Sequence, residues 1–183
     1  MKSLPIKLKY LLPILCLLLV ACPSNDDETL PAVVPPVAGN EFTVGNTAYA
    51  LSQGFRSPTR LDGPGPEYVT FIALTGNGFT VNDQRELQGR GDLLFMEIYT
   101  NTAVLSPGIY DIGPAASIGE VYLAYETDYD PNFPFNARQF IVDGMLDIQV
   151  DPAGIYTITT TGSDNATGSA FTASFTGLLP TVL

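Results

Sequence analysis

The side chains of this chain that could carry out catalysis are carboxylates, tyrosines and arginines. The sequence has no histidine, its lysines are Lys2, Lys7 and Lys9, and its two cysteines are Cys16 and Cys22. Beyond Cys22 this composition excludes Ser-His-Asp and Cys-His catalysis, Schiff-base lysines, and zinc held by histidine or thiolate. Glycoside cleavage remains open, because it needs only two carboxyl groups at a fixed separation.

Glu97, Glu120 and Glu126 are the candidates for such a carboxylate pair. All three fall in segments of strand-like composition, so they could face one another on a sheet. Acidic residues on the solvent face of a strand are far commoner than catalytic pairs. We therefore predict no catalytic residue and no enzymatic activity, and a carboxylate-based glycan hydrolase is the least favoured alternative.

The segment from Asp128 to Asn132 begins like a calcium-binding loop, with acidic or amide side chains at alternate positions. The EF-hand pattern then requires glycine at its sixth position and glutamate at its twelfth. Phe133 and Gln139 stand there instead, so the chain has no EF-hand. A weaker calcium site at Asp128, Asp130 and Asn132 and a solvated acidic loop both stay open. We assign no metal and no cofactor.

Aromatic residues crowd the same loop, where Tyr129, Phe133 and Phe135 alternate with Pro131 and Pro134. Exposed aromatic side chains on a loop beside a rigid sheet would suit the binding of a ligand or partner. Rings that fold back and cover one end of the core are the commoner arrangement. We name the three aromatic residues as candidate ligand-binding residues.

The start of the chain has the pattern of a secretory signal peptide. Three lysines precede an apolar run at residues 10–20, and small residues follow it. This run is too short to cross a bilayer, which takes roughly 20 apolar residues. We predict a signal peptide over residues 1–21.

Leu19-Val20-Ala21-Cys22 resembles the lipobox of bacterial lipoproteins. The resemblance implies cleavage after Ala21 and attachment of lipid to Cys22, and two or more acyl chains hold a protein stably on a membrane. Residues 22–40 are acidic and rich in proline, which predicts a tether. Its acidic run resembles the surface-export signal of Bacteroidota lipoproteins. We expect an outer-membrane protein exposed on the cell surface, with a periplasm-facing domain as the alternative.

The charge distribution excludes nucleic acid as a partner. All 19 acidic residues follow Cys22, whereas only five arginines do, so the mature chain carries a net charge of −14. A surface this acidic repels phosphate groups, and nucleic-acid binding would need the opposite charge.

Residues 41–183 alternate apolar and polar side chains with period two, which predicts a single all-β domain. We expect an antiparallel β-sandwich of about nine strands, with a closed β-barrel as the alternative. Gly45-Asn46 predicts a two-residue hairpin and Gly144 a bulge, and the last three strands should form a meander. The predicted strands cover residues 41–44, 47–51, 67–75, 92–100, 109–112, 120–126, 138–150, 155–161 and 169–178.

Three short strings are similar to small uncharacterised lipoproteins of Bacteroidota: residues 46–54, Leu105-Ser106-Pro107-Gly108-Ile109-Tyr110 and the tail around Phe175-Thr176-Gly177-Leu178. This resemblance implies a compartment and a β-fold but no activity. We expect a membrane-anchored, non-catalytic binding or structural module. Its expected partners are the membrane, through lipid on Cys22, and an envelope protein or a polysaccharide. An accessory subunit of a nutrient-uptake or secretion complex is the alternative.

Overall fold

The computed structural model describes residues 39–114, 116–132 and 138–182. The predicted signal peptide, Cys22 and the tether up to residue 38 lie outside the described residues. Within the described ranges, no helix is long and apolar enough to cross a lipid bilayer.

The prediction of an all-β fold is confirmed, and the described residues form thirteen strands and no helix. The strands are β1 (Glu41–Val44), β2 (Thr47–Ala50), β3 (Gln53–Arg56), β4 (Arg60–Leu61), β5 (Tyr68–Thr75), β6 (Phe79–Val81), β7 (Leu87–Gly89), β8 (Gly91–Thr100), β9 (Gly108–Ile112), β10 (Glu120–Tyr129), β11 (Gln139–Val150), β12 (Tyr156–Asp164) and β13 (Ala170–Gly177).

All nine predicted strand segments are strands, and four short ones, β3, β4, β6 and β7, were not predicted. The hairpin at Gly45-Asn46 is confirmed, since Val44 pairs with Thr47. The meander is confirmed by the antiparallel ladders that join β11 to β12 and β12 to β13. The alternation of apolar and polar residues and the turn residues of the local sequence therefore determine most of the strand positions.

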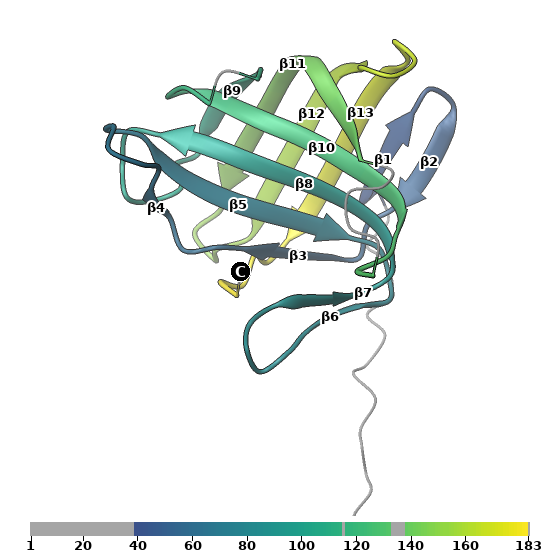
Figure 1. Ribbon diagram of the computed structural model, residues 1–183, viewed down its shortest axis with the longest axis horizontal. Helices are drawn as coiled ribbons and strands as arrows, with labels where there is room; N and C mark the ends of the chain where they lie inside the picture. The colour runs from purple at the N-terminus through teal and green to yellow at the C-terminus, as the bar shows by residue number, and fades with distance from the viewer. Residues whose placement is uncertain (1–38, 115, 133–137, 183) are drawn as a thin grey trace, which may run out of the picture. The chain divides into compact units, whose positions relative to one another are not determined.

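Eleven strands belong to one sheet, which curls into a half-barrel (Figure 1). Its order is β2-β1-β13-β12-β11-β9-β10-β8-β5-β3, with β4 paired to β5. The two layers expected of a sandwich are thus two parts of a continuous curled sheet. The main core fills the inside of the curl, where Phe42, Leu94, Leu123, Ile158 and Phe171 are fully or almost fully buried.

One strand pairing differs from the expected antiparallel pattern, because β9 and β10 are parallel. Both strands run antiparallel to the long strand β11: β10 pairs with its first residues, 139–141, and β9 with residues 145–148. A register shift between Ile141 and Gly144 separates the two stretches, which confirms the predicted bulge. Gly144 has φ +105°, and a Cβ there would collide with the carbonyl oxygen of Thr161, so glycine suits the bulge.

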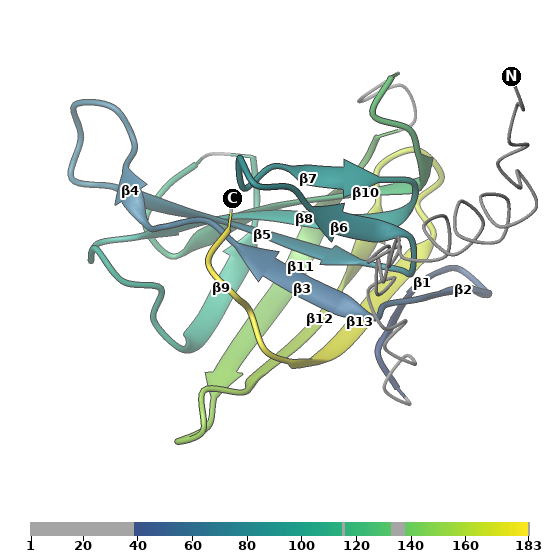
Figure 2. The ribbon, with the colours of Figure 1, turned by 90° about the horizontal axis from the view of Figure 1, so that it is seen from below.

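The segment that follows β13 lies beside β3 (Figure 2). β3 is the last strand of the sheet order, and its Arg56 bonds to the segment that follows β13. The Arg56 amide donates to the Pro180 carbonyl at 3.0 Å, and the Val182 amide donates to the Arg56 carbonyl at 2.8 Å. The curl thus approaches a closed barrel, although this contact is an isolated bridge and not a full ladder.

A second sheet, the β6–β7 hairpin, covers part of the outer face of β5 and β8 (Figure 2). Phe79 of β6 and Leu87 of β7 pack there against Ala73 and Leu93. Strand β8 is thus covered on both of its faces. Its inner residues are fully buried, and Leu93 on the outer face is only 5% exposed.

Candidate functional site

A cavity of about 340 Å³ lies on the outer face of the curled sheet, next to the β6–β7 hairpin. Its volume is at the lower end of the range for small-molecule pockets, roughly 300–1,000 Å³. Most of its lining is apolar or aromatic, and two charged side chains reach it. The lining residues are Ala73, Leu87, Leu93, Phe95, Glu97, Tyr129 and Arg138.

The strand register explains why the outer face is hollow at this place. Phe95 of β8 lies directly between Ala73 of β5 and Ala124 of β10. Side chains on neighbouring strands normally fill the space beside one another, and the short side chain of Ala73, which lines the cavity, leaves part of that space open. Leu87 of the β6–β7 hairpin then lines the cavity from outside the large sheet.

Arg138 and Glu126 form a largely buried ion pair at this site. Arg138 Nε donates to Glu126 Oε1 at 2.9 Å, and the side chains are 18% and 3% exposed. The pairing of Tyr125 with Gln139 brings the two residues together across β10 and β11. The guanidinium carbon also lies 5.3 Å from the centre of the Phe95 ring, a cation–π distance. Removal of the Arg138 charge would leave the Glu126 carboxylate buried without this ion pair, so the pair fixes this wall.

Glu97 is the second charged group of the lining, and Tyr99 holds its carboxylate. The Tyr99 hydroxyl donates to Glu97 Oε2 at 2.9 Å, and Tyr99 itself is buried. Burial and then the hydrogen bond to Glu97 raise the pKa of Tyr99 well above its ordinary value, so the hydroxyl keeps its proton. No ion pair to Glu97 occurs among the described residues. Glu97 therefore presents an oriented carboxylate to the cavity.

Tyr129 is the part of the predicted aromatic loop that the structure places at the cavity. Its ring centre lies 5.9 Å from that of Phe79, and it packs against the cluster below the β6–β7 hairpin. Burial raises the pKa of Tyr129, and the Glu126 carboxylate adds to the rise. Phe133 and Phe135 lie outside the described residues.

The three candidate carboxylates do not gather at one point. Glu97 and Glu126 share the outer face, but Glu126 pairs with Leu93, four residues before Glu97 along β8. At the rise of a strand this is about 13 Å along the sheet, so a carboxyl pair would require both side chains to lean toward each other. Glu120 lies at the start of β10, and its carboxylate accepts from the Ser117 amide at 3.4 Å.

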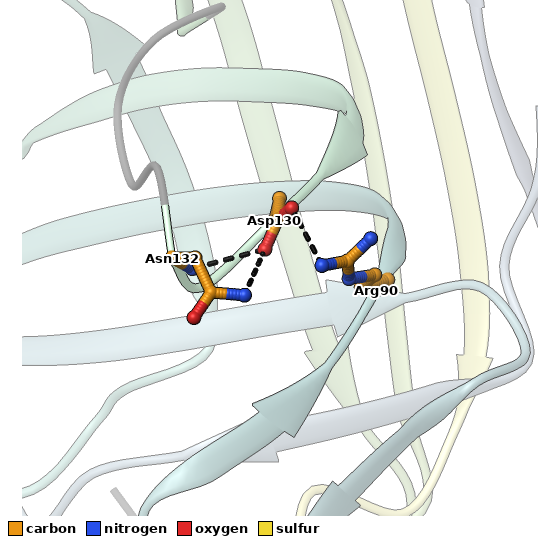
Figure 3. Close-up of polar contacts among 3 residues, drawn as sticks. All are labelled: Arg90, Asp130 and Asn132. Atoms are coloured by element: carbon orange, nitrogen blue, oxygen red, sulfur yellow. Dashed lines mark hydrogen bonds and ion pairs between the residues drawn. The ribbon is translucent and has the colours of Figure 1, made fainter.

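The acidic loop uses its oxygen atoms internally (Figure 3). Asp130 Oδ2 lies 2.8 Å from an Arg90 nitrogen, and Asp130 Oδ1 accepts from the backbone amide and the side-chain amide of Asn132, both at 2.9 Å. Nowhere in the described part of the chain do three or more Asp, Glu, His or Cys residues form a group that could hold a metal ion. Asp130 is thus engaged by Arg90 and Asn132 in this structure.

Sequence reasoning missed Arg138 and Phe95 as site residues. Phe95 lies in the predicted strand 92–100, where Leu93 and Phe95 put apolar side chains on the face opposite Leu94 and Met96, and this second apolar face was the available signal. The partnership of Arg138 and Glu126 depends on the pairing of β10 with β11, which the local sequence does not reveal.

Comparison with known proteins yields no relative that could assign this site. No protein-family model, no curated protein sequence and no solved structure matches the chain.

Proposed function

We propose that the chain is a lipid-anchored envelope protein and that its β-domain is a non-catalytic binding module. The observation that carries the proposal is the cavity on the outer face, with apolar walls and a few convergent polar groups. Small-molecule sites commonly have this composition. The cavity is built largely on paired strands, which hold binding groups more rigidly than loops do.

The proposed anchor is lipid on Cys22, supported by the resemblance of residues 19–22 to a lipobox. The acidic run that follows supports an outer-membrane location with the domain exposed on the cell surface. A site on the outer face of the sheet suits a module on a tether, because the surrounding solution reaches that face. An envelope protein or a polysaccharide segment remains the proposed natural source of the ligand group.

Saturation-transfer NMR with a library of small water-soluble organic compounds tests the cavity. The full lipidated chain would be held in lipid nanodiscs, and empty nanodiscs would give the background. The variant Ala73→Trp fills the cavity, and Ala48→Trp places the same side chain on an exposed position of β2. We expect compounds that receive saturation from the wild type and from Ala48→Trp but not from Ala73→Trp.

Two outcomes would contradict a binding role for the cavity. One is a library without a single specific binder to the wild type. The other is binding that survives unchanged in Ala73→Trp, because the ligand would then occupy another place. The melting temperature of each variant separates loss of the site from loss of the fold.

A further inference from the structure

The charges that line the cavity are not equally balanced. The Arg138 guanidinium is neutralised by Glu126 at 2.9 Å. The Glu126 side chain is only 3% exposed and does not line the cavity. Glu97 has a hydrogen bond from a neutral tyrosine and, within the described residues, no ion-pair partner. The charge that the cavity offers to a ligand is therefore a single carboxylate.

The surroundings of Glu97 add to its preference for positive charge. Ala73, Leu87 and Leu93 provide apolar walls, which lower the local dielectric constant and strengthen an electrostatic contact. The domain carries a large excess of acidic residues, and such a field concentrates cations and repels anions. An anionic ligand would meet an unfavourable charge both in the cavity and at long range.

From this arrangement we infer that the cavity takes a small organic cation, with its apolar body against Ala73, Leu87 and Leu93 and its ammonium group on Glu97. The inference rests on the proposed binding function and names the ligand class for that site. Tyr99 positions the Glu97 carboxylate by the hydrogen bond of 2.9 Å.

A neighbouring cation must be included in this argument. The Arg60 guanidinium carbon lies 4.8 Å from the centre of the Phe71 ring, and Phe71 pairs with Glu97 across β5 and β8. Arg60 is exposed and does not line the cavity, so solvent screens much of its effect. Substitution of Arg60 by Gln should leave cation binding equal or stronger, which makes it the matched control for a change of charge outside the cavity.

Three probes of similar size and different charge test the inference: phenethylammonium, 2-phenylethanol and phenylacetate. Their affinities for the full lipidated chain in nanodiscs would be measured by titration calorimetry, with empty nanodiscs as the blank. We expect phenethylammonium to bind most tightly and phenylacetate most weakly. Glu97→Gln should weaken phenethylammonium by about tenfold, the typical effect of losing a hydrogen bond to a charged group, and leave 2-phenylethanol unchanged.

The possible results separate this inference from the proposed function. If 2-phenylethanol binds as well as phenethylammonium and Glu97→Gln changes neither affinity, the affinity of the cavity does not depend on the charge of the ligand. The inference is then overturned, while the binding function stands. Tightest binding of phenylacetate would also overturn it. If none of the probes binds and the NMR library gives no binder either, both proposals fail.

Discussion

Asp164 and Tyr125 meet inside the half-barrel, and their contact links a turn to the core. The Tyr125 hydroxyl donates to Asp164 Oδ1 at 3.1 Å. Thr167 donates to Asp164 Oδ2 through its hydroxyl at 2.7 Å and its amide at 2.9 Å. Burial alone would raise the pKa of Asp164, but the hydrogen bonds from Thr167 and Tyr125 outweigh it and lower the pKa. For Tyr125, burial and then Asp164 raise the pKa to about 12.

These shifts predict a stability loss at alkaline pH. An unfolded tyrosine ionises near its ordinary pKa of 10.0, whereas Tyr125 keeps its proton up to about 12. A raised pKa contributes stability that is complete below pH 10 and is lost as the pH rises through 12. Relative to Tyr125→Phe, the wild type should lose about 2 kcal/mol of its free energy of unfolding over this window. Urea denaturation at a series of pH values measures this loss. If the free energies of unfolding of the wild type and of Tyr125→Phe fall in parallel as the pH rises, the assignment is contradicted.

The same contact has an acid-side consequence with the opposite sign. The lowered pKa of Asp164 contributes stability that is present above the ordinary value of 3.8 and is lost as the pH falls through the lowered pKa. In the same urea denaturations, the free energy of unfolding of Asp164→Asn should lack the loss that this carboxyl group causes in the wild type as the pH falls.

At the scale of elements, β3 depends on a glycine that lets it pack closely on the end of the chain. Gly54 is buried, and a Cβ there would collide with Leu179 and lie 2.9 Å from Phe175 Cζ. Gly54→Ala should therefore cost about 1–3 kcal/mol through overpacking. Gly113→Ala is the matched control, because its new Cβ would lie 3.6 Å from the Glu120 side chain, an ordinary contact. Urea denaturation compares them, and equal losses would mean that close packing at β3 is unimportant.

Much of this fold was predictable from local pattern, and the unpredicted elements have a common cause. The long strands alternate clearly, so β8, β12 and β13 were located within a few residues. The unpredicted β3, β4, β6 and β7 have at most four residues each, too few to show a period. β1 and β2 are equally short, but the Gly45-Asn46 hairpin signal between them located both. The unpredicted segments are strands because of their neighbours: β3 pairs with β5, and Phe79 of β6 packs on the outer face of the large sheet.

The candidate site was predictable only in part for a similar reason. Glu97 and Tyr129 were candidates from their residue types, but the sequence assigned them to different roles. Their meeting at one cavity depends on the β6–β7 hairpin and on the register of β8 with its neighbours, which are long-range features. Arg138 and Glu126 are brought together by the same kind of long-range pairing.

At the scale of the whole molecule, the proposed function requires the anchor on Cys22. Metabolic labelling of cells with an alkyne fatty acid tests it directly. The wild type should incorporate label and fractionate with membranes, and Cys22→Ala should do neither. Cys16→Ala is the matched control, because Cys16 lies in the predicted signal peptide and would be removed with it. Label on Cys22→Ala, or loss of label from Cys16→Ala, would contradict the predicted lipid site.

The pairing of β1 with β13 has a consequence for the order in which the molecule is made. Glu41 lies opposite Ser174, so the first of the described strands to be synthesised pairs with the last of them. β1 can find its place only after β13 has been synthesised, and closing a loop of that length is slow. Until then the nascent chain exposes unpaired, apolar strand edges, which are prone to aggregate. Biogenesis of this protein should therefore depend on chaperones that hold the chain open until its last strand is delivered.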